Sequence, residues 1–180
     1  MRDPFLSKPK GIIEWLAVYR LYRAAFPAKE RKPFSVIVKM YRSRKTDVWC
    51  VWQRGTLLGF ATTINGEQIL LDYLAVSRRW QGQGIGTQIL QTLQQIYRGK
   101  GLFVEIESPY EAVPDRRARL RRKAFYLRCG MTPLNVMASV FGVEMELLGW
   151  DCSLDFDQYQ GFYRDHYSPR AADHIKNQAP

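Results

Sequence analysis

The segment LLDYLAVSRRWQGQGIGTQIL, residues 70–90, carries the strongest structural signal in the chain. Its first part is an apolar run of strand length, and from Ile85 onward apolar residues recur at helical spacing. Gly82, Gly84 and Gly86 stand between the two parts. Small residues let a backbone approach a phosphate closely, and the N–H groups that open a helix attract negative charge. The segment therefore predicts a strand, an anion-binding loop and a helix.

The residues after the glycines narrow the choice of ligand. A nucleotide P-loop needs Lys followed by Ser or Thr directly after its last glycine, whereas Thr87 and Gln88 follow Gly86 in this sequence. A dinucleotide fingerprint, G-x-G-x-x-G, begins at Gly82 and Gly84 but meets Thr87 where its third glycine belongs. Glu105 follows at about the distance of the ribose-binding acid in such folds. A dinucleotide thus stays a minor alternative.

The rest of the chain alternates between helix and strand patterns. An apolar stripe from Ile12 to Phe26 predicts a first helix, and Phe34 to Tyr41 fits either a helix or a strand. Three antiparallel strands follow, and the Asn65-Gly66 pair predicts a type I′ hairpin turn. The remaining expected elements are a helix over 84–98, a strand LFVEIE, a helix over 116–129, two strands within PLNVMASV and GVEMELLGW, a helix over 156–163 and a polar, mobile tail from Ser168.

This order of elements predicts the α/β (α+β) class, with a mixed, mostly antiparallel central sheet flanked by helices. The 180 residues fit a single domain. We expect residues 11–150 to form its core, and residues 151–180 to add a C-terminal helix and tail.

Composition limits the kinds of chemistry. Lys and Arg number 27 against 17 acidic residues, a formal charge of +10, which favours a nucleic acid, an acidic membrane surface or a phosphate-rich cofactor. The three cysteines have no CxxC spacing, and both histidines lie near the C-terminus, so neither a metal site nor a catalytic triad is expected. No apolar stretch suits a membrane span or a secretory signal, and we expect a cytoplasmic protein.

Two motifs resemble those of the GNAT superfamily of N-acyltransferases. Gln81-x-x-Gly84-x-Gly86 after a strand is similar to motif A, and AFYLRCGM is similar to the family's F-Y-x-x-x-G-F, with Met131 in place of the last aromatic. The resemblance covers about residues 47–149, and AAFPAKERKPF is similar to a segment of some bacterial members of unassigned substrate. The family usually opens with a strand, which is either missing here or contributed by Phe5 to Lys8.

The resemblance implies acetyl-CoA as cosubstrate and assigns residues to it. Backbone groups of Leu74, Ala75 and Val76 would hold the pantetheine arm, with the Val76 N–H facing the thioester oxygen. Tyr126 matches the family's general acid. The residues implied to hold the pyrophosphate are Gln81, Gly82, Gln83, Gly84, Ile85, Gly86 and Thr87.

Charged residues complete the set of candidates. Arg119 and Arg122 precede Tyr126 on one helical face and could reach the CoA phosphates, although the family often has Asn at the position of Arg119. A solvated basic face is an equal alternative. Candidates for the general base are Asp72, Glu105 and Glu107, the last two on one side of a strand by their spacing, or each is an ordinary acid at the sheet edge.

The leading hypothesis is an acetyl-CoA-dependent N-acetyltransferase that moves an acetyl group directly to a primary amine of a small molecule or peptide. Its rival is a non-catalytic nucleic-acid-binding module that uses the basic run from Arg116 to Lys123. Nucleic acid is the less favoured partner, because that run also carries the Tyr126 motif and CoA would explain part of its charge. No membrane partner is expected, a homodimer is compatible with the sequence, and the acceptor stays open.

Overall fold

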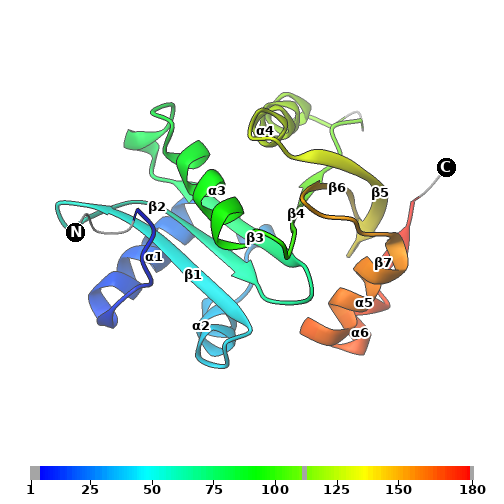
Figure 1. Ribbon diagram of the computed structural model, residues 1–180, viewed down its shortest axis with the longest axis horizontal. Coiled ribbons are helices and arrows are strands. Elements are labelled where there is room, and N and C mark those ends of the chain that lie inside the picture. The colour runs from blue at the N-terminus through cyan, green and yellow to red at the C-terminus, as the bar shows by residue number, and fades with distance from the viewer. Residues whose placement is uncertain (1–4, 111–112, 179–180) are drawn as a thin grey trace. The chain divides into compact units, whose positions relative to one another are not determined.

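The computed structural model describes residues 5–110 and 113–178 (Figure 1). The chain divides into two compact units. The first unit runs to Asn65 and resumes over Leu71–Ile96, and the second contains Gly66–Leu70 and continues from Tyr97. Strand β3 (Ile69–Val76) contributes residues to both units.

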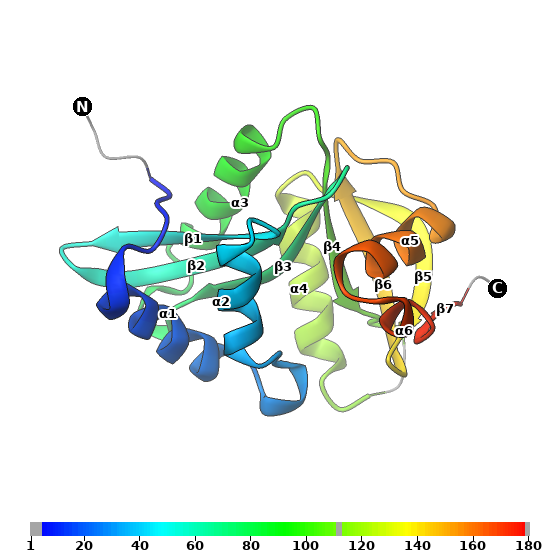
Figure 2. The ribbon, with the colours of Figure 1, turned by 90° about the horizontal axis from the view of Figure 1, so that it is seen from below.

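The first unit holds the order β1-β2-β3, with β1 and β2 antiparallel. Helices α1 and α2 cover one face of these strands and α3 covers the other (Figure 2). Trp49 pairs with Ala61, and the register shifts once between Val51 and Trp52. The elements, in chain order, are α1 (Gly11–Ala25), the 3-10 turn η1 (Ala28–Glu30), α2 (Phe34–Arg42), β1 (Thr46–Gln53), β2 (Thr56–Ile64), β3, the 3-10 turn η2 (Arg78–Trp80) and α3 (Ile85–Ile96).

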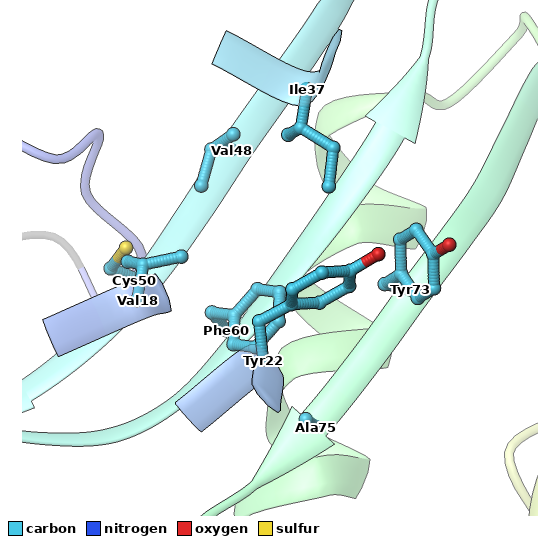
Figure 3. Close-up of a cluster of buried hydrophobic side chains, with 8 residues drawn as sticks. All are labelled: Val18, Tyr22, Ile37, Val48, Cys50, Phe60, Tyr73 and Ala75. Atoms are coloured by element: carbon cyan, nitrogen blue, oxygen red, sulfur yellow. The ribbon is translucent and has the colours of Figure 1, made fainter. Parts of the chain in front are cut away.

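Alternate strand residues and one side of each helix form the core of the first unit. Figure 3 shows the cluster, which consists of Val18, Tyr22, Ile37, Val48, Cys50, Phe60, Tyr73 and Ala75. The expected stripe of α1 is partly wrong. Ile12 and Leu16 are 85% and 44% exposed, whereas Val18 and Tyr22 are buried. The buried side of this helix therefore follows Trp15, Val18 and Tyr22, at spacings of three and four.

Two open points of the N-terminal region are resolved. Residues 34–42 form a helix, because Phe34, Ile37 and Tyr41 fall on one side at helical spacing and contact the core. The segment Phe5 to Lys8 supplies a single antiparallel bridge instead of a strand. The Ser7 N–H donates to the Cys50 carbonyl at 3.0 Å, and the Cys50 N–H donates to the Ser7 carbonyl at 2.8 Å.

The prediction of a type I′ turn at Asn65-Gly66 is wrong. Neither residue has positive φ, and β2 and β3 are joined by residues 65–68. A Cβ on Gly66 would lie 2.8 Å from His166 Nε2 and 2.9 Å from Phe162 Cε2, so glycine is needed there for close packing. Two consecutive positive φ angles occur instead at Arg54 and Gly55, between β1 and β2, and at Phe141 and Gly142, between β5 and β6.

The second unit holds the order β3-β4-β6-β5-β7. β3 enters it through Ile69 and Leu70, which pair in parallel with Leu102 and Phe103, and the other ladders here are antiparallel. The predicted mixed, mostly antiparallel α/β fold is thus confirmed. The elements are β4 (Leu102–Glu107), α4 (Arg116–Arg128), β5 (Thr132–Val140), β6 (Val143–Trp150), α5 (Phe156–His166), α6 (Pro169–Ala172) and β7 (Ile175–Asn177).

Part of the tail, which was expected to be mobile, forms α6 and β7. Ala172 and Ile175 are buried, and the side-chain amide of Gln160 donates to the carbonyl groups of both. Two buried side chains were enough to fix a segment that is otherwise polar. In the part of the chain that the structure describes, no helix is long and apolar enough to cross a membrane.

Candidate functional site

The glycine loop opens α3 and leaves its backbone donors available. Gly82 and Gly84 have φ of 76° and 80°, a left-handed conformation that glycine adopts without strain. A Cβ on either would meet nothing within 4 Å, so space lies open beside the loop. The first N–H of the helix ladder is that of Gln88, which donates to the Gly84 carbonyl at 3.0 Å. Among described residues, the N–H groups of residues 82–86 have no acceptor. This is an anion-binding arrangement.

Glutamine side chains fix the loop to the end of β3. The Gln81 amide donates to the Val76 carbonyl at 3.1 Å, and the Gln83 amide donates to the Arg79 carbonyl at 3.1 Å. Ala75 is buried in the core, while Leu74 and Val76 are half-buried. The loop and the strand end thus form one local structure inside the first unit.

Gly59 of β2 is a residue that the sequence reasoning missed. A Cβ there would lie 2.8 Å from the Ala75 carbonyl oxygen and 3.1 Å from Ile89 Cδ1. Any larger residue would therefore push β2 away from both the end of β3 and α3. A glycine inside the strand LLGFATTI is the signal that could have revealed this close approach.

Tyr126 of α4 is buried, and its ring lies edge-on to that of Phe125, with 5.1 Å between the ring centroids. Burial raises the pKa of Tyr126 to about 12, although the nearby Arg122 opposes the shift. Its hydroxyl makes no hydrogen bond to any described residue. At neutral pH the side chain is therefore a protonated donor that is not committed to another described group.

Arg119 of α4 is 8% exposed, and its guanidinium group is directed at the protein. It donates to the Ser108 carbonyl at 3.0 Å and to Asp115 at 3.2 Å, and lies 3.7 Å from Glu107. The side chain of Arg122 is 45% exposed and donates to Glu107 at 3.2 Å. Arg122 consequently keeps more of its surface available for a ligand than Arg119 does.

Glu105 and Glu107 of β4 contact different helices. The hydroxyls of Tyr159 and Tyr163 of α5 donate hydrogen bonds to Glu105 at 2.7 and 2.8 Å, whereas Glu107 forms ion pairs with Arg119 and Arg122 of α4. Burial, and then the Glu105 carboxylate, raises the pKa of Tyr159 well above its ordinary value. Glu107 ends the strand, where the long arginine side chains of α4 can reach it. The two acids therefore do not share one environment, although their spacing suggested it.

Asp72 forms a salt bridge with Lys32, with 2.7 Å between Oδ1 and Nζ. Two buried tyrosines lie beside this pair. The Tyr73 hydroxyl donates to the Glu30 carbonyl at 3.0 Å and accepts from the Lys32 N–H at 3.2 Å. The Tyr22 hydroxyl donates to the Lys32 carbonyl at 3.0 Å. Burial raises the pKa of both phenols. These contacts, which sequence reasoning missed, fix the α1–α2 connection to β3 just before Leu74.

Comparison with known families assigns this chain. The model of the acetyltransferase (GNAT) family matches residues 15–131. The chain belongs to this family. A search of curated proteins found no match. The matched part contains the glycine loop, Tyr126 and all three candidate carboxylates, and it ends at Met131, the residue that replaces the usual aromatic.

Solved structures of GNAT proteins share the fold. A GNAT-family protein from Bacteroides thetaiotaomicron is 18% identical with a TM-score of 0.69, over 93% of this chain and 98% of its own. The ribosomal-protein-S18-alanine N-acetyltransferase from Escherichia coli is 18% identical with a TM-score of 0.62, over 83% and 94%. A GNAT acetyltransferase from Elizabethkingia anophelis with acetyl-CoA bound is 16% identical with a TM-score of 0.58, over 83% and 100%.

Proposed function

We propose that this GNAT acetyltransferase moves the acetyl group of acetyl-CoA directly to a primary amine of a small molecule or peptide. The observation that carries the proposal is the loop at residues 81–86, with its left-handed glycines, open space and available N–H groups at the start of α3. A pyrophosphate needs that combination of close backbone approach and several convergent donors. Residues 1–180 act as one catalytic domain, with acetyl-CoA as cosubstrate.

We assign the cofactor-binding residues as the family resemblance implies. Gln81, Gly82, Gln83, Gly84, Ile85, Gly86 and Thr87 hold the pyrophosphate, and Leu74, Ala75 and Val76 hold the pantetheine arm. Arg122 reaches the CoA phosphates. Arg119 holds Glu107 and Asp115, because its guanidinium nitrogens are directed at these groups.

The proposed chemistry needs a base, an oxyanion donor and an acid. The amine nitrogen forms a bond to the thioester carbon while the Val76 N–H faces the carbonyl oxygen. The carbon–sulfur bond breaks, and Tyr126 protonates the departing thiolate. The proton released by the amine passes through water to a carboxylate, for which Asp72, Glu105 and Glu107 are the candidates. A solvent proton then restores Tyr126.

The acceptor class rests on general features of the chain. Amines of small molecules and of peptides both fit, and the Escherichia coli neighbour is named for acting on an alanine of a ribosomal protein. None of the three cysteines forms a disulfide among the described residues, which supports a reducing compartment such as the cytoplasm.

A two-step experiment tests the proposal. Saturating CoA should raise the melting temperature, since a hundredfold excess over Kd stabilises by about 2.7 kcal/mol, or roughly 5–10 °C for a chain of this size. A panel of amines with acetyl-CoA should then identify an acceptor through release of free thiol. If CoA leaves the melting temperature unchanged while NAD raises it, the assignment of the loop is wrong.

A further inference from the structure

The basic residues of α4 separate into two opposite faces. At about 100° per residue, Arg117, Arg121 and Arg128 lie within about 40° of one another, and Arg119 and Tyr126 lie on the other side. Burial agrees with this geometry, because Arg119 and Tyr126 are buried whereas Arg117, Arg121 and Arg128 are exposed. One helix thus has an inner and an outer set of cations.

The inner cations are neutralised inside the second unit. Arg119 and Arg122 contact Glu107, and Lys123 binds Glu146 at 2.7 Å. Burial alone would lower the pKa of Lys123, but its hydrogen bonds to Glu146 and Tyr110 outweigh burial and raise that pKa. These residues hold α4 to β4 and β6, so their charge is used in the fold.

The outer cations have no such compensation. Arg117, Arg121 and Arg128 make no ion pair or hydrogen bond with any side chain among the described residues. The sequence of α4, RRARLRRKAFYLR, contains no acid that could pair with them four residues away. Leu120 and Leu127, both 41% exposed, flank this row about 60° to 120° around the helix. This outer face consists of Arg117, Leu120, Arg121, Leu127 and Arg128.

The arrangement costs stability in the free protein. Arg117 lies in the first turn, where the helix dipole disfavours positive charge, and the acid at that end, the N-cap residue Asp115, is bound by Arg119. Arg117 and Arg121 are like charges four residues apart, which repel across one turn. Each effect amounts to a few tenths of a kcal/mol. An anion bound along this face would attract both arginines and so compensate these repulsions.

We propose that the outer face of α4 binds the phosphate backbone of a nucleic acid. The row from Arg117 to Arg128 is about 16 Å long at 1.5 Å per residue, a length over which a nucleic acid presents several phosphates. Two half-exposed leucines give too little apolar surface for a helix that inserts into a membrane. CoA would explain part of the charge of this helix, and the separation into faces places Arg117, Arg121 and Arg128 outside that part. This inference does not depend on acetyl transfer.

The test is fluorescence anisotropy with labelled single-stranded RNA and DNA of the same sequence, about 20 nucleotides long, over salt from about 50 to 200 mM. The variant R117Q/R121Q/R128Q should bind about a hundredfold more weakly near 100 mM salt, with a salt slope smaller by about 2, because each lost phosphate contact removes about 0.7 from the slope. RNA and DNA should both respond, since the backbone is what the face contacts.

A matched control removes the same charge elsewhere. Arg20, Arg42 and Arg98 are exposed, scattered arginines, and R20Q/R42Q/R98Q has the same net charge as the α4 variant. We expect this control to bind nucleic acid within a few-fold of the parent. Equal weakening by both variants would overturn the proposal, because binding would then follow net charge alone. Undetectable binding of RNA and DNA by the parent would also overturn it.

Two further measurements separate this face from other anions. The α4 variant should keep the CoA dissociation constant of the parent and melt at the same or a slightly higher temperature, because the unfavourable charge interactions are removed. A parallel loss of CoA affinity would assign the outer arginines to the cofactor site and overturn the proposal. Vesicles containing phosphatidylserine provide the last comparison, and a variant that loses vesicle binding while keeping nucleic-acid binding would assign the face to a membrane instead.

Discussion

The polar donors of the glycine loop in the first unit lack partners among the described residues, whereas the cations of the α4–β4 region in the second unit are paired. In the loop, backbone N–H groups of residues 82–86 have no acceptor among described residues, and the space beside Gly82 and Gly84 is open. In the α4–β4 region, Arg119, Arg122 and Lys123 are already bound to Glu107 and Glu146. Available donors, more than formal charge, therefore support the glycine loop as the proposed site of the anionic cofactor, because a cation that already has a partner must first give it up.

The largest effect should come from Gly84→Val. A branched Cβ at φ of 80° strains the loop and occupies the space that a pyrophosphate needs. We expect CoA to bind a hundredfold or more weakly, which is about 3 kcal/mol, as measured by calorimetry. Gly86→Val should act in the same direction, within the first turn of α3.

Gly99→Val is the control that distinguishes backbone strain from a blocked CoA site. Gly99 also has φ of 80° with nothing within 4 Å of its Cβ position, and it lies three residues beyond the end of α3. It should cost as much stability as Gly84→Val and leave the CoA dissociation constant unchanged. Equal losses of CoA affinity in the two variants would mean that backbone strain, and not the cradle, explains the result.

Arg119→Met should lower the free energy of unfolding by about 3 kcal/mol, because it leaves the buried Glu107 carboxylate with less compensating charge. Arg122→Met, at a half-exposed position, should cost under about 1 kcal/mol. Urea unfolding of both variants measures the difference. A stable Arg119→Met protein with much weaker CoA binding would contradict the comparison and make Arg119 a phosphate ligand.

Tyr126→Phe should lower turnover by about tenfold to a hundredfold and leave CoA affinity unchanged, because only the hydroxyl is lost. Since the pKa of Tyr126 is raised to about 12, the acid form persists through neutral and moderately alkaline pH. Loss of activity through this group is expected only as the pH rises toward that value. An unchanged rate, under conditions where chemistry limits turnover, would make Tyr126 a core aromatic.

Local patterns made much of the fold predictable. The extents of α3 and α4 agree with the sequence within two residues, because helical periodicity and a following glycine define each of them. The glycine loop is where motif A predicts it, between the end of β3 and α3. These features depend on neighbours in the sequence, which a single chain displays directly.

Contacts between distant segments could not be predicted. The role of Gly66 depends on close packing against Phe162 and His166, about a hundred residues away. The Asn-Gly pair by itself indicates a turn with positive φ, because the sequence does not display these distant neighbours. The engagement of Arg119 by Glu107 likewise requires β4 and α4 to be placed together. Helical spacing located Arg119 correctly on the face of Tyr126, but spacing does not tell which partner a charge meets.

The smallest expected effect tests which carboxylate takes the amine proton. Tyr159→Phe removes a hydroxyl that donates to Glu105 at 2.7 Å, which should cost about 1–2 kcal/mol of stability. Losing a donor makes that carboxylate a stronger base. If Glu105 is the base, the acid limb of the pH profile of turnover should move to higher pH by a few tenths of a unit.

Tyr22→Phe is the control. It removes a buried hydroxyl that donates to the Lys32 carbonyl, so it should cost a similar amount of stability and leave the acid limb of the pH profile in place. An unmoved limb in Tyr159→Phe would assign the role to Glu107 or Asp72, whose charges are already compensated by cations.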